Sequence, residues 1–154
     1  MTPDIRKTVD VPLTPAQTFD LFTAKLDTWW PSATHSVSAA NDDTPICVKI
    51  EPRKGGKITE KLRDGTSATW GTVTHWAPGN RIDINWYVGR DADAATQVTV
   101  MFTPIDTGTR VDLTHTGFDA HGVTAMASHD GYNTGWDHVL GQCFLAKCRI
   151  YITA

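Results

Sequence analysis

Hydrophobic and polar residues alternate near the start of the chain, from residue 5 to residue 11. A period of two residues is typical of a β-strand with one buried face. Pro12 should end this strand, and Thr14 and Pro15 then provide the N-cap and the first residue of a helix. Apolar residues recur at helical spacing up to Pro31, which should end or kink this helical stretch; they are Phe19, Phe22, Leu26, Trp29 and Trp30.

The period returns to two between residue 45 and about residue 117, after a polar segment, 32–44, that we expect to be a loop. Turn signals divide this region into six short alternating segments. Asp64-Gly65 is a strong hairpin signal, and Pro78-Gly79-Asn80 and Asp106-Thr107-Gly108 mark further turns. Short strands joined by short turns favour an antiparallel meander.

The last part of the chain, from about residue 124 to 152, has no proline and returns to helical spacing. Three glycines, at 131, 135 and 141, each weaken a helix by roughly 1 kcal/mol relative to alanine. Gly131 and Gly135 share a face, so either a neighbour packs closely there or the first turn frays. The order of elements predicts an α+β fold with the helix packed on the sheet, and ligands bind in such spaces between elements.

The composition narrows the class of protein. The 154 residues fit one domain, and 40% of them are hydrophobic and 20% charged, as in ordinary globular proteins. A formal net charge of −3 argues against a nucleic-acid partner, because proteins that track phosphates usually have a basic surplus. Six tryptophans are many for this length, and tryptophan suits cavity walls and interfaces as well as cores.

The cysteines and the termini indicate a cytoplasmic protein. Cys47, Cys143 and Cys148 are odd in number and lack CxxC spacing, so neither a disulfide framework nor a cysteine-rich zinc site is expected. The N-terminus has no apolar segment of a signal peptide, and no apolar run is long enough to span a membrane. Apart from His115, the histidines lack the spacing that metal ligands usually show, so no metal site or cofactor is expected. They are His35, His75, His121, His129 and His138.

Several local patterns follow one another along the chain. They are Trp29-Trp30, Gly55-Gly56-Lys57-Ile58, Asp64-Gly65, Gly71-Thr72-Val73, Pro78-Gly79-Asn80-Arg81-Ile82, the stretch 109–118 and Gly135-Trp136. Their order resembles the START-like (SRPBCC) superfamily, in particular the branch related to the C-terminal domain of the Hsp90 ATPase activator homologue.

The resemblance implies a single helix-grip domain over residues 1–154. In that fold a first strand and short helices precede a six-strand meander, and the curved antiparallel sheet of about seven strands wraps around a long C-terminal helix. Members of the superfamily are similar to ligand-binding proteins, polyketide cyclases, lipid carriers and co-chaperone domains, so fold alone does not decide the function.

Two titratable residues lie on strand faces that should point inward. His115 is in phase with Val111 and Leu113, and an inward histidine in a pocket suits general acid–base catalysis. The alternative is a histidine bonded to the backbone or to a neighbouring strand. Glu60 is in phase with apolar neighbours, where a carboxylate needs a partner or has a raised pKa. The alternative is a solvated Glu60 on an edge strand.

Aromatic residues supply the other candidates for the walls of a pocket. Trp30, Trp86 and Trp136 are the tryptophans we expect to line it, although plain core packing is the alternative. Tyr132 lies one turn before Trp136 on the same helix face, where its hydroxyl would bind a polar group of a ligand or cap a buried group. Phe118 closes the family-like stretch and is added to this set.

These observations give three hypotheses for the function. The leading one is binding of a small hydrophobic or aromatic ligand in an internal pocket between the sheet and the C-terminal helix, without a cofactor. The second is an enzyme of the cyclase or hydratase type, with His115 and Glu60 as acid and base. The third is a protein-interaction module similar to the co-chaperone domain. A homodimer is also compatible with the sequence.

Overall fold

The computed structural model describes residues 2–151 and contains seven strands in one sheet. The strands are β1 (Ile5–Val11), β2 (Cys47–Ile50), β3 (Lys57–Lys61), β4 (Ser67–Ala77), β5 (Arg81–Trp86), β6 (Thr96–Ile105) and β7 (Gly108–Thr116). Their order across the sheet is β1-β7-β6-β5-β4-β3-β2, and every neighbouring pair is antiparallel. The predicted six-strand meander is therefore present, and the first strand pairs with the last.

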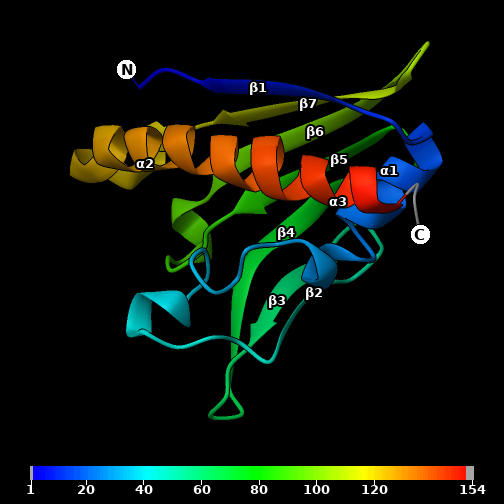
Figure 1. Ribbon diagram of the computed structural model, residues 1–154. Helices are drawn as coiled ribbons and strands as arrows, with labels where there is room; N and C mark the ends of the chain where they lie inside the picture. Colours follow the sequence, from blue (N-terminus) through cyan, green and yellow to red (C-terminus); the bar gives the residue numbers. More distant parts are fainter. Residues whose placement is uncertain (1, 152–154) are drawn as a thin grey trace.

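The C-terminal helix crosses one face of this sheet (Figure 1). It consists of α2 (Ala125–His138), a π-helical segment (Val139–Phe144) and α3 (Leu145–Tyr151), which follow one another without a break. Its buried residues, among them Trp136, Leu140 and Phe144, face the sheet. This is the predicted α+β arrangement, with a sheet that holds a long helix.

The N-terminal helix is shorter than the sequence predicts. Helix α1 (Pro15–Phe22) begins with the expected capping box, since Gln17 and Thr14 exchange hydrogen bonds, but it ends at Phe22. A short 3₁₀ turn (Leu26–Thr28) follows, and Trp29 and Trp30 lie beyond it. The indole N–H of Trp29 donates to the backbone oxygen of Leu21, 2.8 Å away, which folds the chain back on α1.

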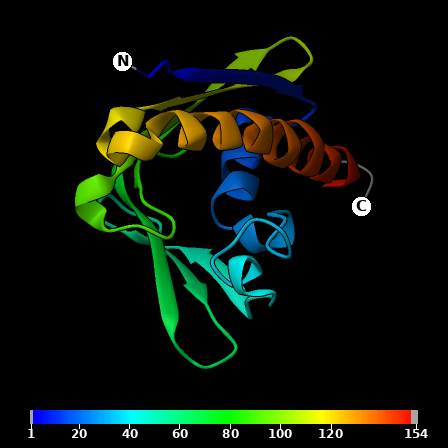
Figure 2. The same ribbon diagram turned by 90° about the vertical axis from the view of Figure 1, so that its left-hand side faces the viewer.

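The polar segment between α1 and β2 is the predicted loop, with one 3₁₀ turn (Ala39–Asn41) in it. Figure 2 shows this segment, in blue and cyan, on the same side of the sheet as the long helix. It therefore contributes to the space between the helix and the sheet.

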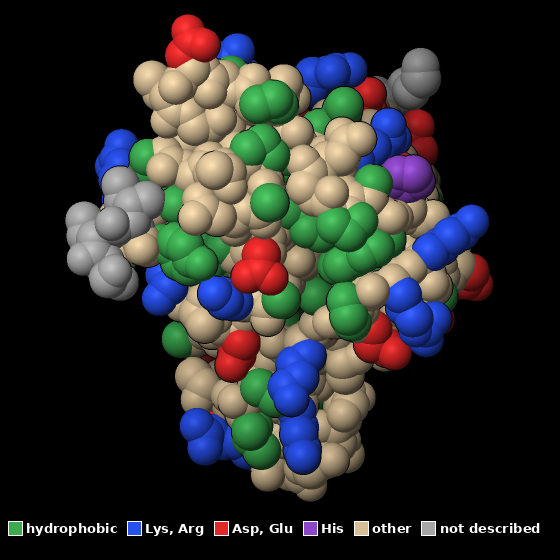
Figure 3. Space-filling view, turned by 90° about the vertical axis from the view of Figure 1, so that its right-hand side faces the viewer, with side chains coloured by type: hydrophobic (Ala, Val, Ile, Leu, Met, Phe, Trp, Pro, Cys, Tyr) green, Lys and Arg blue, Asp and Glu red, His purple; other side chains and the backbone are tan. Residues whose placement is uncertain are grey.

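The surface shows no segregation of charge on the face seen in Figure 3, where basic and acidic side chains are interspersed around a central group of hydrophobic side chains. Ion pairs with N–O distances of 2.9 Å join Lys7 of β1 to Asp137 of α2, and Asp10 to Arg110 across β1 and β7. Among residues 2–151, no helix combines the length and the apolar character needed to cross a bilayer.

Candidate functional site

A cavity of about 320 Å³ lies between α2, strands β4 and β5, and the loop before β2. Its apolar walls are Trp30, Trp70, Trp86, Val88, Tyr132, Trp136 and Val139. Polar side chains come from Thr34, His35, Ser36 and Ser128, and the remaining positions are Ala127, Gly131 and Gly135. None of the described residues that line the cavity is Lys, Arg, Asp or Glu, so the cavity suits a neutral, largely apolar molecule.

Four tryptophans form a contiguous wall. The ring centroid of Trp30 lies 5.1 Å from that of Trp70 and 5.9 Å from those of Trp86 and Trp136. The rings of Trp86 and Trp136 are 5.7 Å apart. These contacts join a loop, two strands and the long helix, so the wall exists only when the whole sheet has folded around the helix.

Trp70 reaches this wall because β4 is irregular. Ile58 pairs with Gly71 and Thr59 pairs with Thr69, so Trp70 is an extra residue at a bulge. Such bulges re-aim side chains next to functional sites. Trp70 was not among the predicted wall residues, because alternation alone does not reveal a bulge.

A second void, of about 20 Å³, lies behind the tryptophans, among apolar side chains of α1, the 3₁₀ turn after it and the sheet. It is far smaller than the cavity of about 320 Å³, and its lining is apolar. The rings thus fill the deep part of the space between sheet and helix and leave the cavity on the side of the loop and α2.

His115 lies beneath this wall and is fully buried. The indole N–H of Trp136 donates to Nδ1 of His115 over 3.0 Å, so the imidazole proton stands on Nε2. Nε2 lies 2.6 Å from the hydroxyl of Thr96, which in turn donates to the backbone oxygen of Trp86 over 3.2 Å. His115 therefore links Trp136 and Trp86, two of the four tryptophans of the wall, through a continuous chain of hydrogen bonds.

The electrostatics keep His115 neutral. Burial, together with the nearby His121 and His129, lowers the pKa of His115 to about 3. Both ring nitrogens are engaged and His115 does not line the cavity. The contact with Thr96 on β6 is the neighbouring-strand contact of the alternative, and the bond from Trp136 of α2 is an additional one.

Glu60 is also fully buried, and no basic side chain pairs with it among the described residues. Its carboxylate accepts from the backbone N–H groups of Val37 and Ser38 and from the indole N–H of Trp70, each over 2.8 Å, and from the hydroxyl of Ser38. Burial by itself raises the pKa of Glu60, but the hydrogen bonds from Ser38, Val37 and Trp70 outweigh it and hold the pKa below its ordinary value.

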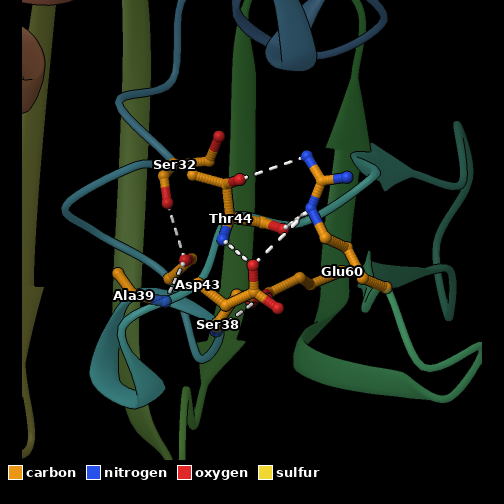
Figure 4. A network of polar contacts seen from close by, with 8 residues as sticks. Ser32, Ser38, Ala39, Asp43, Thr44 and Glu60 are labelled. Atoms are coloured by element: carbon orange, nitrogen blue, oxygen red, sulfur yellow. Dashed lines mark hydrogen bonds and ion pairs between the residues drawn. The ribbon is translucent and has the colours of Figure 1, made fainter.

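The Glu60 carboxylate fastens the loop to the sheet (Figure 4). Within the loop, Ser36 donates to the oxygen of Ser32 and accepts from the N–H of Ala39. At its far end Arg63 donates to the backbone oxygen of Thr44 over 2.9 Å. The segment that carries His35 is therefore held by hydrogen bonds on both sides, and Glu60 also holds the wall residue Trp70.

Tyr132 faces the cavity from α2. Its hydroxyl oxygen accepts the indole N–H of Trp86 over 3.0 Å. Burial raises the pKa of Tyr132, so the phenol keeps its proton at neutral pH. No acceptor for that proton is present among the described residues.

His35 faces the cavity from the loop. Its ring stacks on that of His138, with centroids 5.3 Å apart, and its Nδ1 lies 2.7 Å from the hydroxyl of Thr34. Burial and the neighbouring His138 lower its pKa, so the ring is neutral at neutral pH. The Thr34 hydroxyl donates to the oxygen of Pro31, which leaves it to accept from Nδ1, and Nε2 is then a free acceptor.

The two glycines of α2 leave the cavity open. A Cβ at Gly131 would meet nothing within 4 Å, and one at Gly135 would stand 3.9 Å from Nε2 of His35. Gly131 shows neither the close packing nor the fraying that the sequence leaves open. It lies within continuous helix and lines the cavity.

The structure thus brings four of the seven predicted residues to the cavity: Trp30, Trp86, Tyr132 and Trp136. Glu60, His115 and Phe118 do not line it; Phe118 is buried against the ring of His115, with centroids 4.4 Å apart. Trp70 and His35 were missed. The bulge at Trp70 leaves no signal in the sequence, and the spacing of His35 relative to the other histidines bears only on metal binding.

The described part of the chain offers no metal centre, since no three His, Cys, Asp or Glu side chains within residues 2–151 lie together. The three cysteines are free, as the sequence predicts. Burial raises the pKa of the Cys148 thiol to about 12 and also raises that of Cys143, so neither is an activated nucleophile.

Comparison with known proteins gives the family. The model of the family described as Activator of Hsp90 ATPase homolog 1-like protein matches residues 12–143. No curated protein matches the chain.

Solved structures share the fold over nearly the whole chain. A protein from Mesorhizobium loti has a TM-score of 0.69 at 16% identity and covers 97% of this chain and 98% of its own. An AHSA1-like protein from Aeromonas hydrophila has a TM-score of 0.66 at 16% identity, with 99% and 96% covered. An anthrahydroquino-γ-pyrone synthase has a TM-score of 0.59 at 31% identity, with 85% and 87% covered. The resemblance inferred from the sequence and the predicted helix-grip fold are both confirmed, and the chain belongs to the family of Activator of Hsp90 ATPase homolog 1-like proteins.

Proposed function

We propose that the protein binds a small, neutral, aromatic ligand in the cavity between α2, the sheet and the loop before β2. The observation that carries the proposal is the wall of four tryptophans around about 320 Å³ of space, with no charged side chain among the described lining residues. Volumes of this size suit ligands of a few rings, and aromatic walls favour flat molecules through offset and edge-to-face contacts.

Thermal unfolding in the presence of two-ring aromatic compounds tests the proposal. A ligand at about 100 times its Kd stabilises the folded state by about 2.7 kcal/mol, which raises the Tm of a chain of this size by roughly 5–10 °C. Naphthalene derivatives should produce such a shift and should quench tryptophan fluorescence. Benzoate serves as the control, since no cation lines the cavity to bind it. The proposal is wrong if no neutral aromatic compound raises the Tm.

A second candidate function is a cyclase acting on an aromatic compound in the same cavity. The observation that favours it is the 31% identity to an anthrahydroquino-γ-pyrone synthase over 85% of this chain. Two side chains that line the cavity have a hydrogen-bonding group without a partner among the described residues. They are the hydroxyl proton of Tyr132 and Nε2 of the His35 imidazole. His115 and Glu60, the acid–base pair inferred from the sequence, would have to give up the hydrogen bonds described above to take part.

Closure of a γ-pyrone ring provides a direct assay for the second candidate. In 1-(2-hydroxyphenyl)butane-1,3-dione the phenol oxygen attacks the distal ketone carbon, and loss of one water then gives 2-methylchromone. A cyclase should accelerate this reaction over buffer, and His35→Phe should remove most of the acceleration. A rate equal to that in buffer would leave binding as the function. The third hypothesis, an interaction module, stays a prediction.

A further inference from the structure

The four tryptophans of the wall offer a ligand their ring surfaces only, because every indole N–H is already donated within the protein. Trp30 donates to the backbone oxygen of His35 over 2.7 Å, and Trp70 donates to Glu60 over 2.8 Å. The other two, Trp86 and Trp136, donate to Tyr132 and His115 over 3.0 Å each.

The lining hydroxyls of serine and threonine are engaged as well. Ser36 bonds to the backbone of its own loop, and Thr34 bonds to Pro31 and His35. Ser128 lies 2.7 Å from Nδ1 of His121 and accepts from Arg90 over 3.2 Å. The cavity therefore has little polar capacity left for a ligand.

One donor proton and one ring nitrogen of the lining side chains have no partner among the described residues. One is the proton of the Tyr132 hydroxyl, whose oxygen is occupied by Trp86. The other is the lone pair on Nε2 of His35, whose Nδ1 is occupied by Thr34. The first belongs to α2 and the second to the loop before β2, so they approach the cavity from different walls. One donates and the other accepts.

We infer that the ligand is a neutral hydroxylated aromatic ketone, whose carbonyl oxygen accepts from Tyr132 and whose hydroxyl donates to Nε2 of His35. This inference rests on the proposed function and adds the chemical class and the two residues that select it. Tyr132 and His35 are half-buried, so a ligand that enters the cavity displaces water from the donor and the acceptor. A hydrocarbon leaves both unpaired and is therefore disfavoured. The tryptophan wall supplies affinity for aromatic rings, and the two polar atoms discriminate the hydroxylated ketone from a hydrocarbon.

Four probes of the same ring size separate these contributions: naphthalene, 2-naphthol, 2-acetylnaphthalene and 6-acetyl-2-naphthol. The first has neither polar group, the second and third have one each, and the fourth has both at opposite ends. Each hydrogen bond should improve Kd by about fivefold, so the fourth probe should bind about 25-fold more tightly than naphthalene. Titration of tryptophan fluorescence near neutral pH measures all four.

Two variants assign each gain to its residue. Tyr132→Phe should weaken the two ketones about fivefold relative to naphthalene and 2-naphthol, which accept no hydrogen bond from Tyr132. His35→Phe keeps the ring that stacks on His138 and should weaken only the two naphthols. His138→Phe is the matched control, because His138 stacks on His35 without lining the cavity, and it should leave all four affinities unchanged.

The outcomes separate the two proposals. If no probe binds the wild-type protein, the proposed function itself fails. If all four bind with equal affinity, or if the variants weaken naphthalene as much as the ketones and naphthols, the cavity binds aromatic rings and the assignment of Tyr132 and His35 is wrong.

Discussion

At the scale of single residues, the buried side chains of Glu60 and His115 hold tryptophans of the wall in place through hydrogen bonds. Alternation along β3 and β7 correctly indicates that Glu60 and His115 face inward. It does not reveal their partners, because the donors to Glu60 come from residues 37 and 38 and the donor to His115 comes from Trp136. Sequence patterns predict the face on which a side chain lies, whereas its hydrogen bonds depend on segments far away in the chain.

Replacement of His115 tests its neutral state. The unfolded chain takes up the proton near pH 6.5, whereas the folded chain does so only at about pH 3. Between these values the unfolded state binds one more proton, so the free energy of unfolding decreases as pH falls, by up to ~1.4 kcal/mol per pH unit. Glutamine keeps both hydrogen bonds without titrating, so His115→Gln should reduce this slope by up to that amount. Urea unfolding at a series of pH values measures it, and an unchanged slope would show that His115 is not held neutral.

Glu60→Gln tests the attachment of the loop. In this variant an amide NH₂ group replaces one carboxylate oxygen and cannot accept, so about two of the donors to Glu60 lose their acceptor. The free energy of unfolding should therefore fall by about 2–3 kcal/mol. Asp93→Asn, at an exposed acidic residue, is the control and should change stability by less than about 0.5 kcal/mol. Urea unfolding above the ordinary pKa of glutamate measures both. Equal stabilities of the two variants would contradict the role given to Glu60.

At the scale of elements, helical spacing correctly predicts the C-terminal helix, but it predicts an N-terminal helix that is longer than the observed α1. Leu26, Trp29 and Trp30 repeat at helical intervals, yet Asp27 accepts the backbone N–H of Val48 and Trp29 donates to Leu21. These tertiary bonds favour a bend after Phe22 over further helix. The bulge at Trp70 also depends on the pairing of β3 with β4, and an alternating pattern in the sequence does not reveal it.

The open face of α2 gives a prediction at this scale. Gly131→Leu should place a side chain in the cavity and reduce binding of 2-acetylnaphthalene at least tenfold, while helix propensity raises stability by up to about 1 kcal/mol. Gly141→Leu is the matched control, because Gly141 also has open space around it but does not line the cavity. Isothermal titration should show full affinity in the control. Equal affinity in both variants would place the ligand elsewhere.

At the scale of the whole molecule, the order of β2 to β7 follows from the sequence, because short turns join neighbouring strands of the meander, whereas the pairing of β1 with β7 is seen in the structure. The exact extent of the cavity does not follow, because it depends on how far four tryptophan rings from separate elements fill the space under α2. The excess of tryptophan thus serves both the core and the cavity wall.

Because the wall joins the loop, the sheet and the helix, we expect the chain to unfold as one cooperative unit. Tryptophan fluorescence and far-ultraviolet circular dichroism should give the same midpoint in urea. Two separate transitions would contradict the expectation of a single domain over residues 1–154.

The central claim, that an aromatic ligand binds against the tryptophan wall, is tested most directly by the indole N–H signals in a ¹H–¹⁵N correlation spectrum. Each of the six tryptophans contributes one signal, and four of them line the cavity. On titration with 6-acetyl-2-naphthol, the signals of Trp30, Trp70, Trp86 and Trp136 should shift most, and those of Trp29 and Trp76 should shift least. Unchanged wall signals, or larger shifts at Trp29 and Trp76, would contradict the account.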